Sequence, residues 1–421
     1  MGILDSLLGT ASGIISGGNG VIDWLNRKIT ECGQVEIGSL FSNSFHLNTI
    51  ISGTNQNIRS IALSKLLPFA LSSGFPIIEL HLSNSPLPGM IKRTLGTQYP
   101  VSFVNSMSSN FLPFWGLNPE DAIDIILDAA PEKFSISPNA RYYLEAVTDM
   151  MTAHKMKPSF NNYLTCPHNS LLNRIDSLEM SGTITDFQSQ EMKSKIMIGQ
   201  SESFKIDSYL KTLSKQMGNA LWSKNNNTAP AGIGKAIQDH GLISIDIGTS
   251  CRSIYVDFLV EIIKNVSLKG GRFILILDSM NIAENKKLKE LTSTPLAGSN
   301  VIFSCDDLVA SCSGDENYTK AILGNAEQFF IFSHTSGTSA SLWAGVIGEY
   351  EKTERSTSTQ KGKSYSSDPF DFEPSKNDSR TVTVSKKRDY VVPPEKISNM
   401  QPNEFYYKAK NTQGVKHCRM A

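Results

Sequence analysis

Short, nearly continuous apolar runs recur along this chain, and they constrain its fold more than any other feature. A strand covered by helices on both faces requires such a run, whereas a strand with one face in water alternates apolar and polar residues. Helical patterns lie between the runs, which predicts an α/β fold with a doubly wound, mostly parallel sheet. The runs are Thr49–Ser52, Pro76–Leu80, Leu242–Ile247, Phe273–Leu277, Val301–Ser304 and Phe329–Ser333, and the helical patterns are Arg59–Leu67, Ser253–Val266, Lys286–Leu291 and Ser339–Ile347.

The alternation stops between residues 118 and 235, where we find amphipathic helical patterns and no convincing strand. Pro119-Glu120-Asp121 has the acids expected in a first helical turn. We interpret 118–235 as an all-α domain inserted into a sheet domain formed by 36–117 and 236–421. Residues 352–380 are rich in Ser, Thr, Lys, Asp and Gly and predict a mobile loop.

Residues 1–35 are interpreted as an N-terminal amphipathic helix and a linker. The helix packs on its own domain, which we favour, or it docks on a partner or a membrane interface. No apolar run reaches the roughly 18 residues of a membrane-spanning helix. We therefore expect a cytoplasmic chain, with a peripheral position at the inner face of the membrane as the second option. The apolar stripe of the helix is Ile3, Leu4, Leu7, Leu8, Ala11, Ile14 and Ile15.

Charge and cysteine content exclude some function classes. The chain has 40 basic and 40 acidic residues, so its formal net charge is zero. This balance does not indicate a strongly basic nucleic-acid binder, although it leaves room for a local basic groove. The six cysteines form no CxxC pair, which argues against a zinc site and against a secreted disulfide scaffold.

A strand, a polar loop and a helix follow one another from Thr49 to Leu67, as in a phosphate-binding P-loop. A working P-loop has Gly, four residues, Gly, Lys, and then Ser or Thr. Gly53 and Ser60 stand at the required separation, but Ile58 replaces the second glycine and Arg59 replaces the lysine. Arginine keeps the charge without the compact ammonium of lysine. The degenerate nucleotide-binding residues are Gly53, Thr54, Asn55, Gln56, Asn57, Ile58, Arg59 and Ser60.

Two other strand ends belong to the same prediction. Asp278 ends an apolar strand, where a motor ATPase holds magnesium, although a helix cap explains it equally well. The next position, which normally carries the Glu that activates water, is Ser279, which cannot act as a base. Cys305 stands where such enzymes place a polar sensor, so no catalytic residue is intact. If magnesium is bound, Ser60 and Asp278 are its predicted ligands.

These pieces, in this order, resemble the TraG/TraD-type coupling proteins of conjugation and type IV secretion, which have an FtsK-like P-loop ATPase fold. The resemblance covers roughly residues 40 to 421. It rests on the sequence leading into the P-loop-like segment, the all-α insert, the position of Asp278 at the end of its strand, and the C-terminal region. The matching phrases are Phe45–Gly53, Ile322–Ala326, Gly348–Glu351, Arg388–Ile397 and Asn403–Tyr406.

The resemblance implies a homo- or hetero-oligomeric ring with ATP and Mg between subunits, and secretion-channel or relaxosome proteins as partners, with DNA as a further partner. Arg388 would then approach a neighbour's phosphate, although a solvated Lys386-Lys387-Arg388 run is the more ordinary interpretation. Loss of the P-loop Lys and the catalytic Glu together removes phosphate and water activation. Our first hypothesis is a non-hydrolysing structural or adaptor subunit. An active ATP-driven translocase and a nucleic-acid-binding module are the alternatives.

Overall fold

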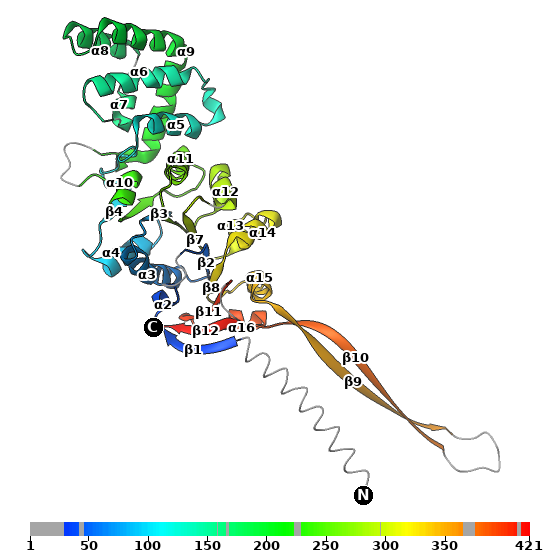
Figure 1. The fold of residues 1–421 in the computed structure, drawn as a ribbon. Helices are drawn as coiled ribbons and strands as arrows, with labels where there is room; N and C mark the ends of the chain where they lie inside the picture. The colour runs from blue at the N-terminus through cyan, green and yellow to red at the C-terminus, as the bar shows by residue number, and fades with distance from the viewer. Residues whose placement is uncertain are drawn as a thin grey trace.

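A ten-stranded sheet forms the centre of this computed structural model (Figure 1). The described residues are 29–41, 46–157, 159–165, 168–222, 229–294, 296–364, 375–410 and 414–421. The strand order is β1-β12-β11-β8-β2-β7-β6-β3-β5-β4, and all neighbours are parallel except β11, which is antiparallel to β8 and β12. The strands are β1 (Ile29–Val35), β2 (Thr49–Ser52), β3 (Ile77–His81), β4 (Val101–Val104), β5 (Leu242–Asp246), β6 (Ile274–Asp278), β7 (Asn300–Cys305), β8 (Gln328–Ile331), β11 (Glu404–Ala409) and β12 (Val415–Met420).

Helices cover both faces of this sheet, which explains the continuous apolar runs. In β6, Ile274 and Ile276 join the core beneath α3 and α4, whereas Leu275 and Leu277 join the core beneath α11 and α12. All five residues of β6 are buried. The predicted fold class is therefore confirmed. The helices flanking the sheet are α2 (Ile37–Phe41), α3 (Gln56–Ser72), α4 (Leu87–Leu95), α10 (Ile233–Gln238), α11 (Ile254–Leu268), α12 (Lys286–Ser293), α13 (Leu308–Ser311), α14 (Glu316–Asn325), α15 (Gly337–Ile347) and α16 (Pro394–Ser398).

The chain between β4 and β5 is helical, as the sequence predicts for the insert, and Figure 1 shows these helices stacked at one end of the molecule. The long helix α9 begins with a capping box in which Thr185 and Gln188 satisfy each other's backbone N–H groups. The exact borders of the proposed domain, 118–235, remain an interpretation. The helices are α5 (Pro119–Ala129), α6 (Ala140–Ala153), α7 (Phe160–Leu164), α8 (His168–Met180) and α9 (Asp186–Met217), with short 3-10 turns at Glu132–Phe134 and Gly218–Ala220; a further 3-10 turn, Ile282–Glu284, follows β6.

The sheet is wider than the sequence predicts. Strands β1, β4 and β12 were not expected, and β1 lies inside the predicted linker of residues 1–35. The reason is physical: β1 and β4 are the two edges, no residue of β1 is buried, and β12 has Lys416, His417 and Arg419 between its buried residues. Short or partly polar edge strands lack the continuous apolar run by which the central strands are recognised.

The loop predicted at 352–380 is wrong for the part that the structure describes. Strands β9 (Glu349–Ser364) and β10 (Ser375–Tyr390) pair in antiparallel register as a separate two-stranded sheet. Figure 1 shows this hairpin extending away from the body of the molecule. Neither strand belongs to the large sheet, and both are mostly polar. The search for apolar runs therefore misses this hairpin. The predicted N-terminal amphipathic helix, whose apolar stripe runs from Ile3 to Ile15, lies outside the described residues.

Across the described ranges, we find no helix that is both long and apolar enough to cross a bilayer.

Candidate nucleotide site

The loop that connects β2 to α3 is shorter than a P-loop. Strand β2 ends at Ser52 and α3 begins at Gln56, with Asn55 as the N-cap residue whose side chain accepts a hydrogen bond from the Ile58 N–H at 3.3 Å. Gln56, Asn57 and Ile58, which the P-loop pattern assigns to the loop, are therefore already helical. Ile58 is partly buried against the core that lies under α3. Only three residues remain to curve around a phosphate.

Two backbone N–H groups of this loop, those of Gly53 and Thr54, bond to the protein itself. The Gly53 N–H donates to the Cys305 carbonyl at 3.2 Å, and the Thr54 N–H donates to the Ser333 carbonyl at 3.0 Å. The Arg59 N–H donates to the Asn55 carbonyl at 3.2 Å. A P-loop binds phosphate through N–H groups that lack an internal partner. Here the Cys305 carbonyl at the end of β7 and the Ser333 carbonyl just after β8 take up the N–H groups of the first two loop residues.

The Arg59 side chain is directed inward from α3 and is only 1% exposed. Its Nε donates to Ser304 Oγ at 3.3 Å, its Nη2 donates to Ser279 Oγ at 2.8 Å, and its Nη1 donates to the Gly53 carbonyl. A guanidinium carries its five N–H donors in a rigid plane, so it can link three acceptors that a lysine ammonium would not match. The cation thus binds groups at the ends of β2, β6 and β7.

Asp278 ends β6 and is fully buried. Ser279 Oγ donates to its Oδ1 at 3.2 Å, and Ser85 Oγ donates to its Oδ2 at 2.6 Å. Ser279 therefore connects the Arg59 guanidinium to the Asp278 carboxylate. Its backbone has a φ of 55°, in the left-handed region that a residue other than glycine rarely adopts. Residues in such conformations cluster at functional sites and cost about 1–3 kcal/mol each.

The two remaining motif residues, Gly53 and Ser60, differ in whether packing explains them. A Cβ added at Gly53 would meet the Phe332 Cβ at 2.5 Å, so the close approach of the residues just after β2 and β8 is enough to require glycine there. Ser60 Oγ is buried and has no hydrogen-bond partner in the described part of the chain, which is what a bound cation would satisfy. However, Asp278, the other predicted magnesium ligand, is already bonded to two hydroxyls. In this arrangement the residues present do not fit a magnesium nucleotide.

Cys305, at the predicted sensor position, is buried at the end of β7. Its Sγ donates to Ser52 Oγ at 3.6 Å, and Ser52 Oγ also shares a hydrogen bond of 3.2 Å with His334 Nε2. Burial raises the pKa of the Cys305 thiol to about 12 and lowers the pKa of His334 to about 4. Both side chains are therefore neutral at pH 7, so the cluster offers neither a thiolate nor an imidazolium.

Sequence reasoning missed a second buried cluster at the same edge of the sheet. His81 Nδ1 lies 2.9 Å from Glu79 Oε2, and Ser244 Oγ donates to the same carboxylate at 2.5 Å. His81 is in register with Asp246 of β5 and with Asp278 of β6. A signal was present in the sequence, because Glu79 and His81 are the polar residues of an otherwise apolar run.

Burial alone would lower the pKa of His81, but the carboxylates of Glu79, Asp246 and Asp278 outweigh it and the net pKa is raised. Asp278 therefore lies between two basic side chains of the chain itself, with Arg59 reached through Ser279 and His81 on the adjacent strand. Arg388, by contrast, is exposed on β10 in register with Glu351 and belongs to the separate hairpin. Its inter-subunit role remains a prediction.

The fold is similar to solved structures of a bacterial conjugative coupling protein, TrwB. The unbound form of TrwBdeltaN70 has a TM-score of 0.50 and 12% identity, covering 90% of this chain and 85% of that one. The form in complex with sulphate has a TM-score of 0.50, 13% identity and coverages of 96% and 91%. The complex with the non-hydrolysable ATP analogue ADPNP has a TM-score of 0.50 and 12% identity, and the match covers 94% of this chain and 91% of that one.

No family model and no curated protein matches the sequence. At such low identity the structural similarity concerns the fold, and the fold is that of the conjugative coupling proteins, as the resemblance predicts.

Proposed function

We propose that this chain is a coupling-protein-like component of a conjugative DNA transfer or type IV secretion apparatus, and that it acts as a structural or adaptor subunit without hydrolysing ATP. The fold similarity to TrwB over nine-tenths of the chain supports the first part. The solved TrwB complexes contain ATP and GTP analogues, so nucleotide binding is a property of that protein. The buried position of Arg59 is the observation that supports the second part.

Two features of the site support a subunit that does not turn over ATP. The Arg59 guanidinium bonds Gly53, Ser279 and Ser304 at the place where a P-loop would present its lysine. The residue after Asp278 is a serine, whose hydroxyl accepts from Arg59 and has no basic character. A general base must carry a lone pair with a pKa near the working pH, and a serine hydroxyl does not. Loss of phosphate and water activation each removes orders of magnitude of rate.

In this proposal the chain contributes its fold to a larger assembly, as a member of a homo- or hetero-oligomeric ring. Secretion-channel or relaxosome proteins and DNA are its proposed partners, and a position at the inner face of the membrane is its proposed location. An active translocase would need a base from elsewhere, whereas a nucleic-acid-binding module would need a basic channel. At the Asp278 site, neither alternative has an observation in the described residues that favours it over the adaptor.

ATP turnover by the full chain tests the proposal. We expect the wild type and Asp278→Ala to release phosphate at the same background rate. Arg59→Lys should also remain at background, because restoring the lysine does not supply the missing base at position 279. An exposed, distant variant such as Lys92→Glu controls for contaminating ATPase. Turnover by the wild type that Asp278→Ala abolishes would contradict the proposal and favour the translocase.

A further inference from the structure

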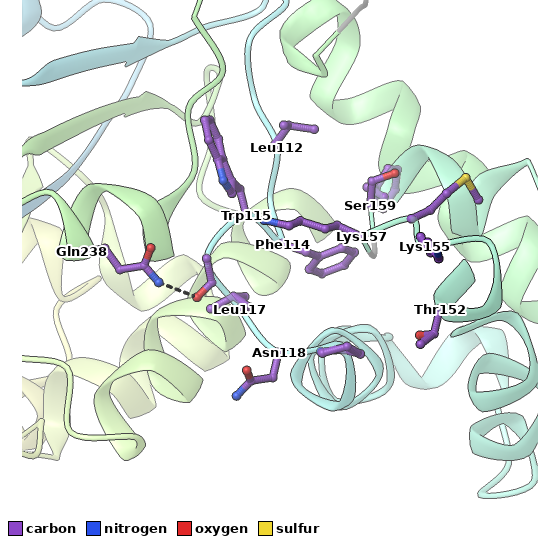
Figure 2. A pocket seen from close by; sticks show the side chains of 14 residues that line it. Leu112, Phe114, Trp115, Leu117, Asn118, Thr152, Lys155, Lys157, Ser159 and Gln238 are labelled. Atoms are coloured by element: carbon purple, nitrogen blue, oxygen red, sulfur yellow. Dashed lines mark hydrogen bonds between the residues drawn. The ribbon is translucent and has the colours of Figure 1, made fainter. Parts of the chain in front are cut away.

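A cavity of about 620 Å³ lies where the helical insert meets the sheet domain, away from the Asp278 site. Its walls come from the segment after β4, the turn after α6, the start of α7 and the end of α10 (Figure 2). This volume falls within the range of about 300–1,000 Å³ that is typical of small-molecule sites, which favour domain junctions. Nothing in the proposed function uses this cavity.

One side of the cavity is aromatic and firmly held. Phe114 and Phe160 are almost fully buried, and Phe114 packs edge-on against Tyr163 and Phe258 at centroid distances of 5.9 and 5.7 Å. Trp115 is only partly buried and lines the cavity. Because Tyr163 and Phe258 hold the Phe114 ring in place, this wall has little freedom to collapse into the cavity. The cavity therefore has a preformed apolar surface that suits a flat ring.

The backbone beside Trp115 is equally constrained. Gly116 has a φ of 89°, and a Cβ there would meet the Gly234 carbonyl carbon at 2.7 Å. Gln238 Nε2 donates to the Gly116 carbonyl at 3.2 Å, as Figure 2 shows. These contacts fix the strand-to-helix segment against α10, so the indole is presented from a rigid support.

The opposite rim is cationic. Lys155 and Lys157 line the cavity, and none of its described lining residues is acidic. In the described part of the chain neither ammonium group forms an ion pair. Lys155 has a φ of 55° in a turn closed by its own N–H to the Thr152 carbonyl at 2.8 Å, which sets where the two lysines emerge. In Figure 2 the Lys157 side chain extends from the rim toward Trp115.

Lysines often follow a helix because they interact well with its last carbonyl groups. That explanation accounts for one cation near the end of α6 but not for an aromatic-walled cavity beneath it. We propose that this cavity binds an aromatic anion of nucleotide size, with its ring against Trp115 and its phosphate on Lys155 and Lys157. A free nucleotide and a nucleotide unit of a single strand share this chemistry. Base–aromatic stacking and phosphate–lysine contacts both favour it.

Calorimetric titration of the full chain tests this proposal with AMP, adenosine, inorganic phosphate and a short single-stranded oligonucleotide. We expect AMP to bind at least about tenfold more tightly than adenosine or phosphate alone, because only AMP has both a base for Trp115 and a phosphate for the two lysines. A tenfold difference in affinity is about 1.4 kcal/mol. If the oligonucleotide binds as tightly as AMP, the natural ligand is a nucleotide unit of a single strand. Weaker binding of the oligonucleotide identifies the free nucleotide.

Matched variants separate this cavity from the Asp278 site. Lys155→Glu with Lys157→Glu should weaken AMP binding at least about tenfold, because two phosphate contacts become repulsive. Trp115→Leu should weaken it, whereas Trp115→Phe keeps a ring and guards against a folding defect. Lys92→Glu, an equivalent charge reversal on α4, should have no effect. If AMP fails to bind, if the double lysine variant binds normally, or if Asp278→Ala abolishes the binding instead, the proposal is overturned.

Discussion

Arg59 and Ser279 depend on each other. The guanidinium needs an acceptor at the end of β6, and Ser279 provides one while also donating to Asp278. A glutamate there would bring a second carboxylate beside Asp278, whereas the serine adds no charge to a buried site. The left-handed backbone of Ser279 is held by its N–H, which donates to the Ser304 carbonyl at 2.8 Å. Arg59 and Ser279, which stand at the positions of the P-loop lysine and the catalytic glutamate, thus belong to one buried network. Two unrelated substitutions would not be expected to contact each other in this way.

His81 gives the site a pH dependence. Its pKa is raised by the carboxylates of Glu79, Asp246 and Asp278, so protonation stabilises the folded state. This contribution is fully present below the ordinary histidine pKa and is lost as the pH rises through the raised value. We therefore expect the difference in unfolding free energy between the wild type and His81→Gln, measured with urea, to be greatest near pH 6 and to decrease toward pH 9.

The size of this effect follows from the buried carboxylate. His81→Gln leaves Glu79 without its charged partner, and breaking a buried pair in this way costs on the order of 3 kcal/mol. Glu395→Gln, an exposed change on α16, should show no comparable pH dependence. A free-energy difference that stayed constant from pH 6 to pH 9 would contradict a protonated His81.

At the residue scale, the sequence predicted which positions meet but not how they meet. Asp278, Ser279 and Arg59 come together as the strand-end reasoning expects. The inward direction of Arg59 could not be predicted, because a side chain on the first turns of α3 reaches either solvent or the sheet with the same local pattern. Its acceptors, Gly53 and Ser304, are known only once β2 and β7 are neighbours.

At the element scale, strands were predictable in proportion to their burial. The six central runs became β2, β3, β5, β6, β7 and β8 because both of their faces are covered. The edge strands β1 and β4 and the hairpin strands β9 and β10 escaped prediction, since their sequences lack a distinctive apolar period. Helix α3 begins three residues earlier than its apolar pattern, because the Asn55 cap adds a polar turn that hydropathy does not reveal.

Close packing of β2 against β8 predicts the effect of a single methyl group. Gly53→Ala should destabilise the fold by about 1–3 kcal/mol, because its Cβ would overlap the Phe332 Cβ just after the neighbouring strand β8. Thermal unfolding of the two proteins measures this difference. The result bears on function, since it would show that Gly53 is required by packing whether or not a phosphate binds.

Gly89→Ala is a suitable control for that substitution. Gly89 lies within α4 with open space where its Cβ would be, so alanine there should stabilise the chain by roughly 0.5–1 kcal/mol. Equal melting temperatures for Gly53→Ala and Gly89→Ala would show that β2 and β8 accommodate the extra methyl group, and the packing explanation of Gly53 would then be wrong.

At the scale of the whole molecule, three regions have distinct positions. The sheet carries the buried Arg59–Ser279–Asp278 network near its middle, the α5–α9 helices lie beyond one edge, and the β9–β10 hairpin extends from the other end (Figure 1). An isolated two-stranded hairpin is only marginally stable in water. A contact with another chain would stabilise the β9–β10 hairpin, which agrees with the proposed role in an assembly.

The central claim is that Arg59 occupies the position a nucleotide's phosphates would need. A crystal structure of the full chain grown with Mg²⁺ and a non-hydrolysable ATP analogue tests it most directly. We predict that Arg59 will still donate to Gly53, Ser279 and Ser304, with no phosphate bound at the N–H groups of residues 53–60 and no magnesium between Ser60 and Asp278. A triphosphate seated on that loop, with the Arg59 side chain displaced toward it, would contradict the claim.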